Sequence, residues 1–161
     1  MPDLHGHVPQ LHDFLEHSAR QWPDKEALVC GTRRATYAQL DQAANALAHH
    51  LVAMGVVSGD RVMVFSENTV ETVVSFWGAL KANATVCVVN PLTKRDKLDY
   101  LVADCQPAAF ITEVSLLPVF SHWRDEPPQL KTLVVAGKGA DDACAGLPSV
   151  MSWDVALAGH T

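Results

Sequence analysis

A glycine-lysine turn after an apolar run is the pattern in this chain that most resembles nucleotide-binding chemistry. Gly137-Lys138-Gly139 directly follows the run Thr132–Ala136, as a phosphate-binding loop follows a strand. Such a loop also needs a further glycine and a Lys-Ser/Thr pair, so that backbone N–H groups converge on the anion. Here Asp141 and Asp142 come next, and their charges would repel phosphate. The sequence therefore favours an ordinary polar surface loop over residues 137–146.

Clustered histidines raise the possibility of a metal site near the N-terminus, at His5, His7, His12 and His17. A zinc site needs about four ligands at suitable spacing, and no cysteine or carboxylate cluster completes such a set here. Solvated histidines are therefore the favoured interpretation. His49 and His50 come at the end of an expected helix, where a partly charged imidazole suits the negative end of the helix dipole.

Nucleophilic chemistry has equally little support in the sequence. There is no G-x-S-x-G motif, and Ser66 has no glycine on either side, as a nucleophile elbow would require. Cys105 paired with His122 stays open, although a buried thiol is favoured. The remaining cysteines (Cys30, Cys87 and Cys144) form no CxxC pair, which is typical of free thiols in a reducing compartment.

Carboxylates and aromatic residues complete the candidates, and we expect structural roles for them. Asp60, Asp96, Asp99 and Asp104 fall at helix caps or exposed helix positions, and Phe76 and Trp77 are expected to pack in the core. The sequence thus predicts no catalytic, cofactor-binding or metal-binding residue.

Composition narrows the class of protein. The chain has 161 residues, a formal net charge of −6 and 48% hydrophobic residues, which predicts a single α/β domain over residues 1–161. No basic stripe suited to nucleic acid is present. No apolar run approaches the ~18 residues that span a bilayer, and no secretory signal is recognisable. We therefore expect a cytoplasmic protein with no nucleic-acid partner and no transmembrane segment.

Four short apolar runs dominate the pattern: Arg61–Phe65, Thr85–Val89, residues 108–112 and Thr132–Ala136. They recur about every 24 residues, which leaves room for a crossover helix between neighbouring strands. Continuous apolar runs are typical of strands buried on both faces. The sequence predicts a largely parallel sheet with helices on both faces.

The helices between these strands carry their own start signals. Thr36 with Gln39 predicts a capping box before a helix over residues 37–54, and Asn68 with Glu71 and Thr93 with Asp96 predict two more. An earlier helix, Leu11–Gln21, offers an apolar face made of Leu11, Phe14, Leu15 and Ala19. Gly78 weakens its helix, which indicates a packing reason for it.

The remaining segments predict a hairpin and an irregular tail. Residues 27–30 and 34–36 flank Gly31-Thr32-Arg33, which predicts a small β-hairpin over residues 27–36. Prolines at positions 118, 127 and 128 interrupt residues 114–130, where we expect no regular element.

Several motifs occur in order with the spacing of a known family: Thr36-Tyr37-Ala38-Gln39-Leu40, Gly59-Asp60-Arg61-Val62, Asn68-Thr69-Val70-Glu71, Ala79-Leu80-Lys81-Ala82-Asn83-Ala84, Asn90-Pro91-Leu92, Lys97-Leu98-Asp99-Tyr100-Leu101 and Ala109-Phe110-Ile111-Thr112. Together they resemble the adenylate-forming superfamily of acyl- and aryl-CoA synthetases, luciferases and peptide-synthetase adenylation domains. The resemblance covers residues 11–135. Asn83 departs from it, because the family usually has glycine there, yet asparagine tolerates left-handed backbone.

The resemblance implies the N-terminal segment of an AMP-forming acyl-CoA synthetase. The family reaction joins a carboxylic acid to ATP, releases pyrophosphate and passes the acyl group to coenzyme A, with Mg²⁺ on the phosphates. Its phosphate loop and C-terminal domain have no counterpart in these 161 residues, so the resemblance implies no cofactor bound by this segment and no activity alone. Asn90-Pro91-Leu92 is more similar to acyl-CoA synthetases than to peptide-synthetase domains, which implies a fatty or other carboxylic acid.

Two alternatives to an inert ligase segment stay open. The chain could be a standalone module that binds a ligand or protein at the carboxyl ends of its strands, or a subunit that completes a site with a second chain. For the segment, we expect self-association through apolar surface that the rest of such an enzyme would cover.

Overall fold

The computed structural model describes residues 9–124, 128–145 and 149–159. His5 and His7, two of the histidines considered as metal ligands, lie outside this part of the chain, as do Pro127 and Gly146. The elements are α1 (Leu11–Gln21), β1 (Glu26–Cys30), β2 (Arg33–Thr36), α2 (Tyr37–Ala53), β3 (Arg61–Phe65), α3 (Val70–Lys81), β4 (Thr85–Val89), α4 (Arg95–Cys105), β5 (Ala109–Glu113), the 3₁₀ helix η1 (Val114–Arg124), β6 (Thr132–Ala136), α5 (Ala140–Cys144), β7 (Val150–Ser152) and α6 (Trp153–Ala158).

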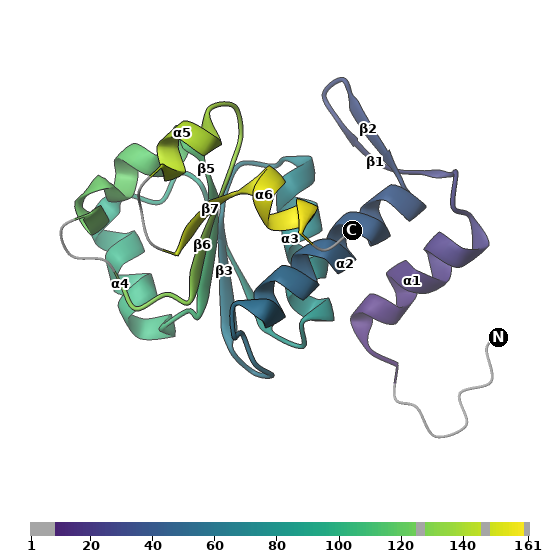
Figure 1. The fold of residues 1–161 in the computed structure, drawn as a ribbon, viewed down its shortest axis with the longest axis horizontal. Coiled ribbons are helices and arrows are strands. Elements are labelled where there is room, and N and C mark those ends of the chain that lie inside the picture. The colour runs from purple at the N-terminus through teal and green to yellow at the C-terminus, as the bar shows by residue number, and fades with distance from the viewer. Residues whose placement is uncertain (1–8, 125–127, 146–148, 160–161) are drawn as a thin grey trace.

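A five-stranded parallel sheet, in the order β4-β3-β5-β6-β7, forms the centre of the fold (Figure 1). This confirms the predicted α/β class, and the four predicted strands form at the predicted places, with β5 one residue later. One expectation was wrong: β4 is not buried on both faces. It lies at an edge of the sheet, where Val88 is 58% exposed.

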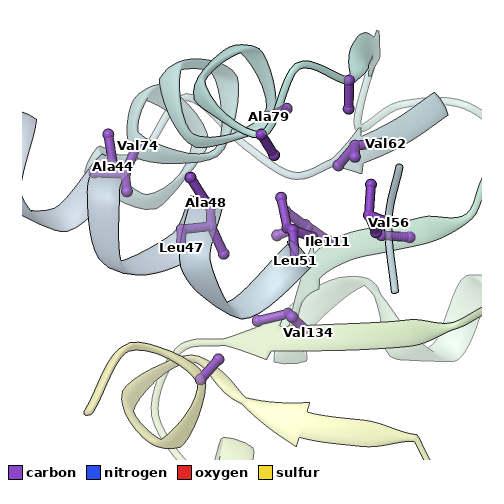
Figure 2. Packing of buried hydrophobic residues seen from close by; sticks show 14 of the residues in the cluster. Ala44, Leu47, Ala48, Leu51, Val56, Val62, Val74, Ala79, Ile111 and Val134 are labelled. Atoms are coloured by element: carbon purple, nitrogen blue, oxygen red, sulfur yellow. The ribbon is translucent and has the colours of Figure 1, made fainter. Parts of the chain in front are cut away.

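Helices cover both faces of the sheet, as predicted. Helices α2, α3 and α6 lie on one face, and α4 and η1 lie on the other (Figure 1). The first face buries the larger core, in which Leu47 and Leu51 of α2 meet Ile111 of β5 and Val134 of β6 (Figure 2). The second face buries Met63, Phe65 and Phe110 against η1.

The start of α2 confirms the predicted capping box. The Thr36 hydroxyl accepts a hydrogen bond from the Gln39 amide at 3.3 Å, and Gln39 Oε1 accepts one from the Thr36 amide at 3.0 Å. The predicted packing reason for Gly78 is also confirmed: a Cβ at this position would lie 2.8 Å from Leu47 Cδ2. Glycine therefore allows α2 and α3 to pack closely.

The other two predicted caps were wrong. The N-cap of α3 is Thr69, one residue after Asn68, and its hydroxyl accepts a hydrogen bond from the Thr72 amide at 3.3 Å. The N-cap of α4 is Lys94, which makes no side-chain cap. Thr93 cannot take that role because it lies in a turn, with its amide bonded to the Asn90 carbonyl at 2.9 Å.

Helix α1 and the antiparallel hairpin β1–β2 extend the fold beyond α2 (Figure 1). The hairpin confirms its prediction, with Gly31 in the left-handed region at φ 59°. The expected apolar face of α1 is only partly correct. Leu15 is buried, but Leu11 and Phe14 are 52% and 62% exposed, because α1 contacts its neighbours along one narrow side.

The C-terminal part is more regular than predicted. Residues 114–124, which the prolines were expected to interrupt, form η1 with Pro118 inside it; η1 is two short helical stretches joined at a kink at Phe120, whose backbone is not helical (φ −125°, ψ 30°). The expected loop 137–146 contains α5, which Gly139 opens in the left-handed region at φ 83°. The short β7 and α6 were also not predicted. These elements are three to six residues long, too short for a visible hydrophobic period.

Candidate functional site

The order of the strands creates a switch point between β3 and β5. The chain passes from β3 to β4 on one side, and then places β5 on the other side of β3. In open α/β sheets, ligands bind in the crevice beyond the carboxyl ends of the strands at such a point. The candidate site is therefore formed by the residues that follow β3 and end β5.

Two glutamates meet at this crevice. Glu113, the last residue of β5, accepts a hydrogen bond from the backbone N–H of Glu67 at 3.2 Å. Ser66, between β3 and Glu67, is 6% exposed, and its hydroxyl has no hydrogen-bond partner in the described part of the chain. The crevice thus presents carboxylates, and the Ser66 hydroxyl next to them in the chain is buried.

The first turn of α3 closes one side of the crevice. The Thr72 hydroxyl donates a hydrogen bond to the Glu67 carbonyl. Arg33 of the hairpin pairs with Glu71 at 2.7 Å, so this guanidinium is already engaged. Within the described residues, neither Glu67 nor Glu113 has an ion-pair partner. The crevice therefore suits a hydrogen-bond donor or a cation, and its charge disfavours a phosphate.

Comparison with known families decides what kind of scaffold this is. The profile of the AMP-binding enzyme family matches residues 15–152. The chain belongs to the AMP-binding enzyme family. Its sheet, switch point and capped helices are therefore this family's scaffold.

Known members of the AMP-binding family resemble the chain in sequence and structure. A medium/long-chain-fatty-acid–CoA/3-oxocholest-4-en-26-oate–CoA ligase of Mycobacterium marinum is 36% identical over 80% of this chain and 24% of its own length. A linear gramicidin synthase polypeptide of Brevibacillus parabrevis is 38% identical over 68% of this chain and 2% of its own. The anthranilate CoA ligase AuaEII, solved with anthranoyl-AMP, superposes with a TM-score of 0.84 at 26% identity, over 95% of this chain and 29% of its own.

The chain thus spans about a quarter of the length of the curated CoA ligases that it matches. These matches support the ligase interpretation, and none of the three proteins is a standalone binding module. No helix within the described residues combines the length and apolarity needed to cross a bilayer.

Motif residues of the AMP-binding family have visible structural roles here. Arg61 donates hydrogen bonds to the Cys105 and Gln106 carbonyls at 2.7 and 3.0 Å, and so holds the C-terminal end of α4. Asn83 adopts the predicted left-handed backbone at φ 58° and donates a side-chain hydrogen bond to Ser58 Oγ at 2.8 Å. The asparagine that replaces the usual glycine is therefore compatible with the turn.

Lys81, in the same family motif, forms a buried ion pair that the sequence analysis missed. Its side chain is 5% exposed, and Nζ lies 2.7 Å from Glu16 Oε1 of α1 and 3.0 Å from Asp41 Oδ1 of α2. The Asp41 contact is close enough for an ion pair but is not aligned as a hydrogen bond. A lysine at an otherwise apolar helix end could have indicated a buried ion pair. Its partners could not be identified from the sequence, because they lie far away in the chain.

The glycine-lysine turn lies at the carboxyl end of β6. Gly137 and Gly139 both adopt positive φ, at 102° and 83°, and Lys138 is exposed. Asp141 and Asp142 occupy the first turn of the five-residue α5. The turn therefore presents acidic side chains where a phosphate would have to approach.

The described histidines lie in different surroundings. His12 Nε2 lies 3.8 Å from Asp13 Oδ1, and His17 is exposed. Among the described residues, no group of three metal-ligating side chains could hold an ion. His50 lies in the last turn of α2, as expected, but it is 3% exposed and its Nε2 lies 3.3 Å from Thr132 Oγ1.

Cys105 and His122 turn to different partners. His122 Nε2 lies 3.0 Å from Asp99 Oδ1, which also accepts a hydrogen bond from Trp123 Nε1 at 2.9 Å. The Cys105 thiol instead neighbours Cys87. The pKa of the Cys87 thiol is raised, first by burial and then by the neighbouring Cys105 thiol. This raised pKa disfavours the reactive thiolate form of Cys87 at neutral pH.

The other predicted residues are structural or exposed. Asp60 accepts hydrogen bonds from Lys131 Nζ at 2.8 Å and from the Val57 amide at 3.0 Å, and these bonds lower its pKa. Asp96 and Asp104 are exposed. Phe76 and Trp77 stack edge to face at 5.3 Å and are half-buried, with Trp77 against the larger core.

Proposed function

We propose that this chain forms part of the scaffold of an ATP-dependent acyl-CoA synthetase, which converts a carboxylic acid, ATP and coenzyme A to acyl-CoA, AMP and pyrophosphate. The observation that carries this proposal is the family match over residues 15–152 together with CoA ligases at 33–36% identity. The fold is consistent with it, because the anthranilate CoA ligase AuaEII superposes over 95% of this chain with a TM-score of 0.84.

A fatty or other carboxylic acid is the proposed substrate of the whole enzyme. The first relatives carry names for medium- and long-chain fatty acids and a steroid acid. Asn90-Pro91-Leu92 forms a tight turn in which Asn90 Oδ1 accepts a hydrogen bond from the Leu92 amide at 2.8 Å. ATP, Mg²⁺ and coenzyme A are the proposed cofactors of the whole enzyme, held by residues other than those described here.

Residues 1–161 are proposed to act as one α/β unit with a structural role. The acidic switch point between Glu67 and Glu113 disfavours ATP phosphates, so we assign no catalytic, cofactor-binding or metal-binding residue. Without further residues the unit is expected to be inactive. A cytoplasmic location accords with ATP and coenzyme A as cosubstrates and with free cysteines.

A segment exchange tests this proposal. The matching segment of the Mycobacterium marinum ligase is replaced by this chain, and fatty acid-dependent CoA ligation is measured. We expect activity to be retained within about tenfold, because the two segments are 36% identical and cores tolerate hydrophobic substitutions that keep total volume and patterning. A folded exchange protein without activity would contradict the proposal.

Two controls accompany the exchange. The matching segment of the linear gramicidin synthase, placed in the same ligase, is expected to leave the fatty-acid preference unchanged if the segment is a scaffold. The isolated 161-residue chain is expected to show no ATP–pyrophosphate exchange with fatty acids and Mg²⁺. Exchange above background would show that catalytic groups lie within it.

A further inference from the structure

Two cysteine side chains meet between the edge strand β4 and the helix α4. Cys87 is the middle residue of β4, and Cys105 is the last residue of α4. Both pack against the core on the face of the sheet that carries α4 and η1. Both are free thiols, and neither residue is fully buried. The pair therefore lies at the rim of this core.

The register of β3 and β4 determines which way Cys87 points. Cys87 pairs with Met63, and Arg61 pairs with Thr85 two residues earlier. Paired residues of neighbouring strands face the same side of a sheet, and so do residues two apart on one strand. Met63 lies in the core on the α4 side. Cys87 and Arg61 therefore face α4 as well.

Arg61 holds the end of α4 at this place. Its guanidinium donates hydrogen bonds to the Cys105 carbonyl at 2.7 Å and to the Gln106 carbonyl at 3.0 Å. On α4, Cys105 follows the buried Val102 by less than one turn, so it continues the stripe that packs on the sheet. The thiols of Cys105 and Cys87 interact there through a side-chain hydrogen bond.

We propose that Cys87 and Cys105 are a redox-sensitive pair that closes to a disulfide when the chain meets an oxidising small-molecule disulfide. The cross-link fastens the end of α4 to the edge strand, and it is independent of the proposed ligase function. A reducing compartment keeps the pair as thiols, so the bond forms only when the thiol pool becomes more oxidised. A disulfide has narrow geometric limits. Both sides can adjust toward them, because β4 has a neighbouring strand on one side only and Cys105 ends its helix.

The oxidation is a thiol–disulfide exchange in two steps. One thiolate of the pair attacks a sulfur of the small disulfide, and the first small thiolate leaves. The other thiolate of the pair then attacks the protein sulfur of this mixed disulfide, and the second small thiolate leaves. The pair thereby loses two electrons and two protons, and the small disulfide takes them up as two thiols. Because the pKa of Cys87 is raised, the exchange is expected to be slow at neutral pH and faster in mild alkali.

The test uses oxidised glutathione as the probe, with the folded 161-residue chain at about pH 8.5. We expect mass spectrometry to find a chain lighter by two hydrogen atoms, in which a disulfide joins the peptides of Cys87 and Cys105. The Tm should rise by roughly 5–10 °C, because the cross-link restricts the unfolded chain, and a thiol reductant should reverse both changes. Separate glutathione adducts on the two cysteines, without the cross-link, would overturn the proposal.

Variants separate this pair from ordinary thiol oxidation. In Cys87→Ser and in Cys105→Ser, the remaining member of the pair is expected to carry one glutathione, and the gain in Tm should disappear. Cys30→Ser with Cys144→Ser is the matched control, because these cysteines lie on β1 and α5. This double variant is expected to form the cross-link at the rate of the unmodified chain.

Three further outcomes count against the pair. A disulfide that involves Cys30 or Cys144, or one that joins two copies of the chain in place of the internal bond, would overturn the proposal. Cross-linking that is equally fast in urea would do the same, because the folded contact would then give no advantage. A cross-linked chain without any gain in Tm would refute the fastening of α4 to β4.

Discussion

Gly78 determines how closely α2 and α3 approach. A Cβ at this position would lie 2.8 Å from Leu47 Cδ2 and 3.0 Å from Leu47 Cβ and Cγ. Leu47 is fully buried, so it has little room to move. We expect Gly78→Ala to lower the free energy of unfolding by about 1–3 kcal/mol, despite alanine's higher helix propensity. Urea denaturation measures this change.

The control for this prediction is Gly159→Ala. No atom lies within 4 Å of a Cβ there, so we expect no loss of stability. Adding Leu47→Ala to Gly78→Ala should make the loss smaller than the sum of the two single changes, because the clash is removed. Additive losses would show that steric contact with Leu47 is not the cause.

Asn83 provides a second residue-scale prediction. Its left-handed backbone, at φ 58°, and its hydrogen bond to Ser58 make the turn before β4 depend on this side chain. Asn83→Ala should cost about 1–2 kcal/mol, because alanine tolerates this conformation poorly and makes no such bond. Asn83→Gly should stay within about 0.5 kcal/mol, because the relieved backbone offsets the lost bond. Equal losses in urea denaturation would contradict this account.

Asp60 makes stability depend on pH in the acid range. Its pKa is lowered in the folded state, chiefly by the hydrogen bond from Lys131 and then by that from the Val57 amide. A lowered folded pKa contributes stability above the unfolded pKa, and this contribution is lost as pH falls through the folded pKa. As the pH is lowered from about 5 to 2, the Tm of Asp60→Asn should therefore fall less than the Tm of the unmodified chain.

The matched control is Asp104→Asn, which changes an exposed carboxyl group on α4. Its Tm should fall with pH as steeply as that of the unmodified chain. Parallel pH profiles for Asp60→Asn and the unmodified chain would refute the role given to the Lys131 contact.

At the scale of elements, Lys81 joins three helices through one ammonium group. It lies on α3 and pairs with Glu16 of α1 and Asp41 of α2. Lys81→Met removes the charge and leaves two half-buried carboxylates close together. We expect a loss of about 1–3 kcal/mol, less than for a fully buried pair, because water reaches Glu16. Amide exchange should accelerate most in α1.

Arg20→Met is the comparison for this ion pair. Arg20 lies 3.7 Å from the same glutamate, but its side chain is 70% exposed. Exposed pairs contribute little, so the expected change is within about 0.5 kcal/mol. If both variants lose the same stability and exchange in α1 is unchanged, Lys81 does not hold the helices together.

At the scale of the whole molecule, exposed apolar side chains on α1 predict self-association. Leu11 and Phe14 are 52% and 62% exposed and lie one turn apart on this outer helix. We expect light scattering to report dimers or larger species that increase with protein concentration. Leu11→Glu with Phe14→Glu should shift the chain toward monomer, whereas Tyr100→Glu on α4 should not. A monomer at all concentrations would contradict this prediction.

Local features of the fold were predictable from the sequence alone. The capping box at Thr36, the left-handed turn at Asn83 and the packing need at Gly78 each depend on residue types and on backbone within a few positions. The strands β3, β4 and β6 were predicted at their bounds because each is a short, continuous run of mostly apolar residues bounded by turn residues. The ordered motifs were sufficient to identify the family.

Tertiary structure alone decided which segments became neighbours. The sequence period does not distinguish a central strand from an edge strand, so the exposure of β4 and the switch point beside β3 could not be read from it. His50 meets Thr132, Lys81 meets Glu16, and Thr112 and Ser152 flank Val135. These contacts join residues distant in the chain, because they depend on the order in which the strands pair, and hydrophobic periodicity records burial without recording the partner.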